Sequence, residues 1–103
     1  MLAMRVYVDI DGTICSQAAG GDYASAVPLL HRIAAINRYY EQGHTVVYWT
    51  ARGTETGIDW RAVTEAQFAK WGVKYHRIEF GKPAFDLFID DRTCNPSDGL
   101  PSL

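Results

Sequence analysis

Short apolar runs alternate with helix-like segments along most of this chain. The clearest runs cover residues 4–10, 44–49 and 85–90, and a weaker one covers residues 74–80. They are rich in Val, Ile, Tyr and Phe, and too continuously apolar for strands that keep one face in water. We therefore expect strands that are buried on both faces, as in a central sheet.

Between these runs, apolar residues recur at helical spacing. The first such segment begins at Pro28, which suits the first turn of a helix, and is stopped by Gly43. The second covers residues 60–71, with Asp59 as a plausible N-cap and Gly72 as a plausible stop. Strands that alternate with helices form right-handed βαβ units. The sequence predicts an α/β fold, namely a minimal Rossmann-like three-layer sandwich around a short, mostly parallel sheet.

Length and composition favour one globular domain. The 103 residues suit a single domain over residues 1–103. Hydrophobic residues make up 48% and charged residues 21%, which favours a packed globule over a disordered chain. A net charge of -2 gives no basic field for a nucleic-acid backbone, so we expect no nucleic-acid partner.

The sequence gives no sign of a membrane segment or of export. No apolar run approaches the roughly 20 residues of a membrane helix, and no basic leader precedes an apolar segment. Cys15 and Cys94 lack the spacing of a zinc site or of a disulfide framework, so we expect free thiols. A soluble, cytoplasmic protein without a membrane partner is expected.

The three clearest apolar runs end in polar side chains. The first run carries Asp9 and is followed by Asp11, the second ends at Thr50, and the last ends in Asp90 and Asp91. Because the carboxyl ends of parallel strands lie along one edge of a sheet, these side chains are expected to converge. Crowded carboxylates repel one another unless a cation neutralises them, and oxygen ligands without Cys or His suit Mg²⁺. The sequence therefore predicts a Mg²⁺ site at this edge.

Other polar groups near the strand ends fit an anionic substrate. Thr50 offers a hydroxyl, Arg52 a guanidinium fork, and Lys82 an ammonium just before the last strand. With the metal they would surround a phosphoryl group, where fixed positive groups supply most of the catalysis. The Asp9 carboxylate would then be free to act as a nucleophile. Arg52 has a second interpretation, a surface ion pair with Glu55 or Asp59.

The motifs resemble those of the haloacid dehalogenase (HAD) superfamily of phosphohydrolases over nearly the whole chain. They are DIDGT at residues 9–13, VVYWT ending at Thr50, Lys82, and IDD at residues 89–91. The resemblance implies that Asp9 attacks phosphorus to form an aspartyl-phosphate, while Asp11 protonates the leaving oxygen and later activates water. It also implies that Thr50 binds the phosphoryl oxygens.

The resemblance further implies how the cofactor is held. Mg²⁺ would be bound by the Asp9 carboxylate, the backbone carbonyl of Asp11 and the Asp90 carboxylate. Asp91 would act through water or by orienting Lys82, which would hold the nucleophile and shield charge. These residues complete the predicted site.

Members of this superfamily usually carry a cap, and this chain looks capless. Residues 13–26 and residues 80–82, where caps are inserted, have only ordinary loop length. An open site suggests a large substrate or a neighbouring subunit as lid, so a homo-oligomer is one expected assembly. The fifth strand common in the family is not expected.

Three functions follow, two of them catalytic and one a binding function. The wording DIDGTIC, YWTARG and GKPAFDLFIDDR is similar to small phosphatase-like proteins of capsular or other surface-polysaccharide biosynthesis, which makes a sugar phosphate the preferred substrate. The first hypothesis is therefore a Mg²⁺-dependent phosphomonoesterase acting on a small phosphorylated metabolite. The alternatives are a non-hydrolysing binding or assembly module of the same fold, and a phosphotransferase with an acceptor other than water.

Overall fold

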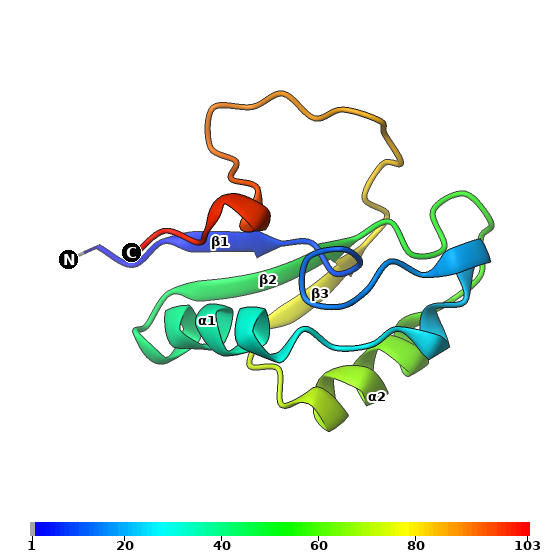
Figure 1. The fold of residues 1–103 in the computed structure, drawn as a ribbon, viewed down its shortest axis with the longest axis horizontal. Coiled ribbons are helices and arrows are strands. Elements are labelled where there is room, and N and C mark those ends of the chain that lie inside the picture. Colours follow the sequence, from blue (N-terminus) through cyan, green and yellow to red (C-terminus); the bar gives the residue numbers. More distant parts are fainter. Residues whose placement is uncertain (1) are drawn as a thin grey trace.

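A computed structural model of the chain describes residues 2–103 (Figure 1). Its strands and α-helices are β1 (Arg5–Val8), α1 (Leu30–Glu41), β2 (Thr45–Thr50), α2 (Arg61–Trp71) and β3 (Arg77–Phe80). Short 3-10 helices are η1 (Ala19–Gly21), η2 (Tyr23–Ser25) and η3 (Pro96–Asp98). Strands and helices therefore alternate up to β3, as the apolar pattern predicted.

The sheet is small, open and entirely parallel. Its three strands lie in the order β1-β2-β3, and Tyr7 pairs with Val47, which pairs with Arg77. β2 is central, and Val46, Val47 and Tyr48 on it are fully buried. The prediction of an α/β, Rossmann-like fold with a parallel sheet is confirmed.

Both helices cover the same face of the sheet, as Figure 1 shows. The strand order runs in one direction, and right-handed crossovers then place every connecting helix on one side. A helix on the opposite face would require the chain to return past β1 and continue the other way. In residues 2–103 it does not, so two layers form where three were expected.

The core lies between this sheet face and the helices. Tyr48 of β2 packs edge-on against Phe68 of α2, with ring centroids 4.8 Å apart, and Phe68 also meets Tyr75 at 5.2 Å. Ile36 of α1 is 1% exposed beside them. Burial of these side chains fixes the helices against the sheet and so positions the loops at the carboxyl ends of the strands.

The strand expected at residues 85–90 is not formed. The segment lies in a long loop that stands away from the sheet after β3 (Figure 1). Its side chains Phe85, Leu87, Phe88 and Ile89 are exposed by 47%, 75%, 49% and 86%. A strand needs a neighbour for its backbone hydrogen bonds, and β1 pairs with β2 alone, so apolar content was insufficient to define a strand here.

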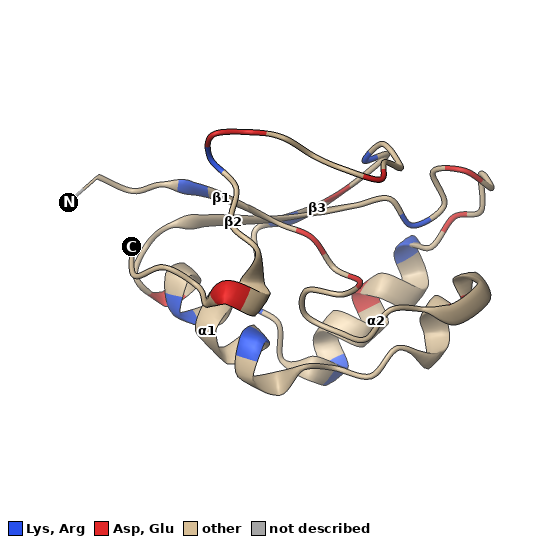
Figure 2. Cartoon of the chain, turned by 45° about the horizontal axis from the view of Figure 1, so that its top comes forward, with Lys and Arg blue, Asp and Glu red and all other residues tan. Residues whose placement is uncertain are grey.

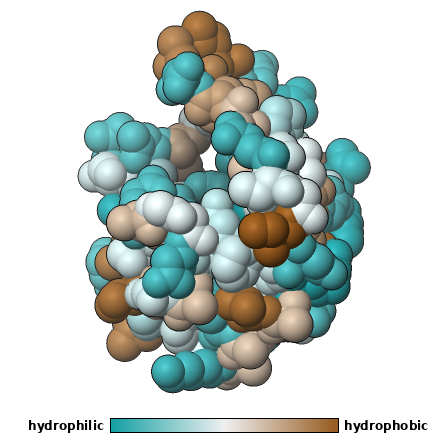
Figure 3. Space-filling view, turned by 90° about the vertical axis from the view of Figure 1, so that its right-hand side faces the viewer, coloured by the Kyte–Doolittle hydropathy of each residue, from teal (hydrophilic) through white to brown (hydrophobic). Residues whose placement is uncertain are grey.

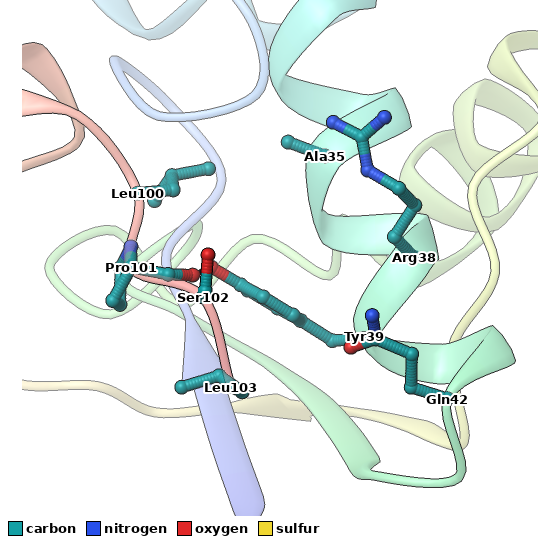
Figure 4. A pocket seen from close by; sticks show the side chains of 8 residues that line it. All are labelled: Ala35, Arg38, Tyr39, Gln42, Leu100, Pro101, Ser102 and Leu103. Atoms are coloured by element: carbon teal, nitrogen blue, oxygen red, sulfur yellow. The ribbon is translucent and has the colours of Figure 1, made fainter.

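The C-terminal tail returns to α1 after this loop. Leu100 and Leu103 pack against the core, and the Tyr39 hydroxyl donates a hydrogen bond to the carbonyl of Pro101. A cavity of about 150 Å³ lies between α1 and the tail (Figure 4).

Neither the length nor the apolar content of any helix in residues 2–103 is sufficient for a membrane span.

Candidate active site

The turn after β1 is anchored by two isoleucines. Ile10 and Ile14 are both 0% exposed, and the Ile14 N–H donates to the Ile10 carbonyl at 2.9 Å. Gly12 between them has φ +79°, a left-handed conformation that glycine adopts without strain. The alternation of apolar and polar residues in DIDGTIC thus buries the isoleucines and leaves Asp9 and Asp11 at the end of the strand.

Asp9 is held by a lysine and remains accessible. Lys82 Nζ lies 3.3 Å from Asp9 Oδ1, and the Thr13 hydroxyl donates to Asp9 Oδ2 at 3.4 Å. The Asp9 side chain is 37% exposed, against 16% for Lys82. A carboxylate that is oriented by a cation and still open to solvent can approach a substrate.

Lys82 is placed by both its backbone and its side chain. Its N–H donates to the carbonyl of Thr50 at 3.1 Å, which ties the loop after β3 to the end of β2. Its ammonium lies 5.5 Å from the ring centroid of Trp49 and 5.4 Å from that of Phe85, within cation–π range. The FGKP loop therefore places the Lys82 ammonium beside Asp9.

Asp11 is bound by Arg52 in a two-point ion pair. Arg52 Nε donates to Asp11 Oδ2 and Nη2 donates to Oδ1, each at 2.9 Å. The Arg52 side chain is 0% exposed and that of Asp11 is 15% exposed. Arg52 thus points into the protein, which corrects its assignment to substrate binding, and its partner is Asp11 rather than Glu55 or Asp59.

Thr50, the last residue of β2, is 1% exposed and lies beside these pairs. Its hydroxyl oxygen accepts a hydrogen bond from the Arg52 N–H at 3.1 Å. A hydroxyl that accepts one bond still has its proton to donate. The Thr50 side chain is nevertheless buried as placed here, so its binding of a phosphoryl oxygen stays a prediction.

Asp90 and Asp91 are not brought to this cluster. Both lie on the loop after β3, where Asp90 Oδ2 accepts from the Arg92 N–H at 3.1 Å. Asp91 lies 3.9 Å from Arg92 in a pair that is 85% to 88% exposed. Figure 2 shows the two acidic stretches apart, one following β1 and one on the loop that precedes η3.

The predicted crowding of four carboxylates is thus avoided. Asp9 is paired with Lys82 and Asp11 with Arg52, while Asp90 and Asp91 lie elsewhere. In residues 2–103 no three His, Cys, Asp or Glu side chains are grouped closely enough to hold a metal ion. As placed here, the carboxylates do not fit the predicted Mg²⁺ site.

Sequence reasoning missed three polar residues around Arg52. They are Cys15, Thr64 and Gln67, and all three are buried. Gln67 carried a signal, since a glutamine occupied an apolar position of the helical period in residues 60–71. A polar residue on the core face of a helix indicates a buried polar partner.

The Cys15 thiol stays protonated beside Asp11. Burial raises the pKa of Cys15 to about 12, and the Asp11 carboxylate adds to the rise while Arg52 opposes it. Cys15 Sγ lies 3.5 Å from Asp11 Oδ1, so the neutral thiol can donate to the carboxylate. Cys15 is therefore a hydrogen-bonding group in this site rather than a nucleophile.

Two cavities lie along α1, and neither is lined by Asp9, Asp11, Thr50 or Lys82. The one in Figure 4 is lined by α1 and the tail, and includes Arg38 and Tyr39. A second, of about 350 Å³, lies further along α1 near His31 and Arg32. Figure 3 views the side of the molecule turned toward the ends of the strands, with apolar groups at its top. In residues 2–103, the candidate site therefore lies at the edge of the sheet, where Asp9 is 37% exposed.

Comparison with known proteins places the chain beside one solved structure. No protein-family model matches the chain. No curated protein matches it either. A crystal structure of an MCSG target from Vibrio cholerae is similar, with 30% sequence identity and a TM-score of 0.82. The match covers 94% of this chain and 86% of that one. The chain belongs to the same family as this Vibrio cholerae protein.

Proposed function

We propose that the protein is a phosphomonoesterase that hydrolyses a small phosphorylated metabolite through an aspartyl-phosphate on Asp9. The observation that carries the proposal is the pairing of Asp9 with Lys82 at the carboxyl edge of a parallel sheet, 3.3 Å apart and open to solvent. Asp11 and the Thr50 hydroxyl lie at the same edge. A nucleophile, an acid and an anion-binding pair are the groups that such a reaction requires.

In the first step Asp9 would attack phosphorus. The bond from phosphorus to an Asp9 oxygen forms while the bond to the leaving oxygen breaks, and Asp11 gives its proton to that oxygen. Lys82 and Thr50 would stabilise the charge on the transferring group. In the second step water attacks phosphorus, Asp11 takes a proton from the water, and the Asp9 carboxylate is released.

Mg²⁺ is the cofactor that the resemblance to HAD phosphohydrolases implies. Its ligands would be the Asp9 and Asp90 carboxylates and the Asp11 backbone carbonyl, with Asp91 acting through water. The present positions of Asp90 and Asp91 do not fit this site, so no step above is assigned to the ion. Metal dependence stays a prediction.

A sugar phosphate of surface-polysaccharide biosynthesis is the preferred substrate class. The wording of the motifs supports it, and so does the open edge, because residues 13–29 contain no larger element than the 3-10 turns η1 and η2. A site without a cap accepts a bulky leaving group. A second subunit could supply the missing cover, so a homo-oligomer belongs to the proposal.

The experiment is phosphate release from a panel of sugar phosphates with Mg²⁺. The wild-type protein should release phosphate from at least one of them. Asp9→Asn should lose activity by about 10³-fold or more, because an amide cannot form the aspartyl-phosphate. Asp98→Asn makes the same change at an exposed residue of η3 and should leave the activity unchanged. Equal release by Asp9→Asn would rule out the mechanism.

The second candidate is a non-hydrolysing module of the same fold. The separation of Asp90 and Asp91 from Asp9 favours it, because hydrolysis in the resembling family uses those carboxylates. Calorimetry distinguishes the two functions. Binding of a phosphorylated compound without turnover would support the module. Release of the dephosphorylated sugar that depends on an added alcohol, with the phosphoryl group recovered on that alcohol, would indicate a phosphotransferase.

A further inference from the structure

Arg52 uses all of its hydrogen-bonding capacity inside the protein. A guanidinium has five N–H donors. Two are directed at Asp11 at 2.9 Å, two from Nη1 go to Thr64 Oγ1 at 3.0 Å and Gln67 Oε1 at 2.7 Å, and Nη2 also contacts Cys15 Sγ at 3.9 Å. With its side chain 0% exposed, Arg52 has no donor left for a substrate.

These contacts join four segments of the chain. Arg52 follows β2, Asp11 lies in the turn after β1, and Thr64 and Gln67 lie on α2. The fourth segment is η2, where the Tyr23 ring lies 4.9 Å from Arg52 Cζ. Gln67 Nε2 also donates to the Tyr23 carbonyl at 2.6 Å. One buried cation thus connects the turn that carries Asp11 to the helix layer.

The loop that carries Arg52 is closed tightly beside it. Gly53 has φ +83°, and a Cβ there would lie 2.1 Å from the carbonyl oxygen of Ile58. The Gly57 N–H donates to the Gly53 carbonyl at 2.8 Å, which closes the turn. The backbone of Arg52 is therefore held on both sides, by this turn and by Thr50.

The two-point geometry of the ion pair fixes the orientation of the Asp11 carboxylate. Two parallel N–H···O bonds fix the plane of a carboxylate, whereas a single ammonium leaves it free to turn. Asp11 keeps 15% of its side chain exposed, and its lone pairs that do not face Arg52 remain available. Asp11 is thus fixed in orientation from the inside and reaches the open edge from the other side.

We propose that Arg52 is the positioning residue for Asp11, fixing the plane in which that carboxylate gives and takes its proton. The inference rests on the proposed function, in which Asp11 is the general acid and base. The Arg52 guanidinium donates to Asp11 and not to Asp9. We therefore expect it to affect the proton transfer by Asp11 more than the attack of Asp9 on phosphorus.

Leaving groups of different basicity provide the test. A sugar alkoxide needs a proton as it leaves, whereas p-nitrophenolate leaves without one, so only the first depends on a well-placed acid. Arg52→Lys keeps the charge and removes the fork. We expect it to lower kcat/KM for a sugar phosphate by at least about tenfold and to change that for p-nitrophenyl phosphate less than about twofold. Arg61→Lys, the same change on the exposed side of α2, should affect neither.

Each outcome has a separate meaning. A wild-type protein that hydrolyses neither compound would overturn the proposed function. An active wild type with an Arg52→Lys variant that loses both activities equally, or neither, would overturn the positioning role. If Arg52→Lys does not fold, Thr64→Val is the variant to measure, because it preserves the shape of the side chain and removes one acceptor of Arg52 Nη1. It should show the same selective loss of kcat/KM for the sugar phosphate, at smaller size. A loss for both compounds, or for neither, would overturn the positioning role.

Discussion

Two segments with similar apolar sequences have different environments in this protein. TVVYWT forms β2, between β1 and β3, and its Val46, Val47 and Tyr48 are fully buried. FDLFID, residues 85–90, is as apolar but lies in the loop after β3, with Leu87 75% and Ile89 86% exposed. The two segments differ in whether neighbouring strands are available, since β2 is hydrogen-bonded to a strand on each side. An apolar run becomes a buried strand only where the topology provides a partner.

The reactivity of the two cysteines compares a buried region with the exposed loop region. Cys15 is buried beside the site and its thiol pKa is raised to about 12, whereas Cys94 is exposed in the loop region. Because the thiolate is the reactive form, we expect iodoacetamide at pH 8 to modify Cys94 more than about 10³-fold faster than Cys15. Mass spectrometry of peptides gives both rates. Cys94→Ser isolates the slow reaction, and similar rates for the two thiols would show that the turn after β1 opens as readily as the loop.

A pair of phenylalanines compares how much the core and the loop after β3 contribute to stability. Phe68 is 0% exposed in the core, and Phe88 is 49% exposed in the loop. Phe68→Ala should lower the free energy of unfolding by about 3–5 kcal/mol, because it removes buried surface and leaves a cavity. Phe88→Ala should lower it by about 0.5 kcal/mol or less. Urea unfolding monitored by circular dichroism checks both, and a large effect of Phe88→Ala would mean that the loop packs against the sheet in solution.

Asp90 tests whether the loop takes part in the reaction. Ligation of Mg²⁺ by Asp90 together with Asp9 requires the loop to lie closer to β1 than it does here. If that ligation occurs during turnover, as the resemblance implies, Asp90→Asn should raise the Mg²⁺ concentration for half-maximal activity by at least about tenfold. Asp86→Asn in the same loop is the matched control. An unchanged Mg²⁺ requirement in Asp90→Asn would leave the loop outside the site.

The part of the site that sequence predicted follows from one rule. Parallel strands end at the same edge, so Asp9 and Thr50 had to lie near each other once the first two strands paired. Lys82 followed because its loop begins where β3 ends. These placements required only strand order and direction.

The rest depended on contacts that strand order does not determine. From sequence, Arg52 could face a substrate, a surface carboxylate or the interior. It faces the interior because α2 packs beside it and provides Thr64 and Gln67 as hydrogen-bond acceptors. The position of Asp90 depended on whether residues 85–90 would find a partner strand. Periodicity reports which surface a segment buries and carries no information on the neighbour that covers it.

β1 lies at the edge of the sheet and pairs with β2 alone in residues 2–103, and we expect this position to matter when molecules meet in concentrated solution. Met4 accepts from the Thr45 N–H, so strand alternation turns the backbone groups of Arg5 and Tyr7 away from β2. Such a row is a template for aggregation, and natural proteins protect it with charge. Arg5, exposed at the start of β1, supplies that charge, and like charges on two molecules repel. We therefore expect added salt to weaken this protection.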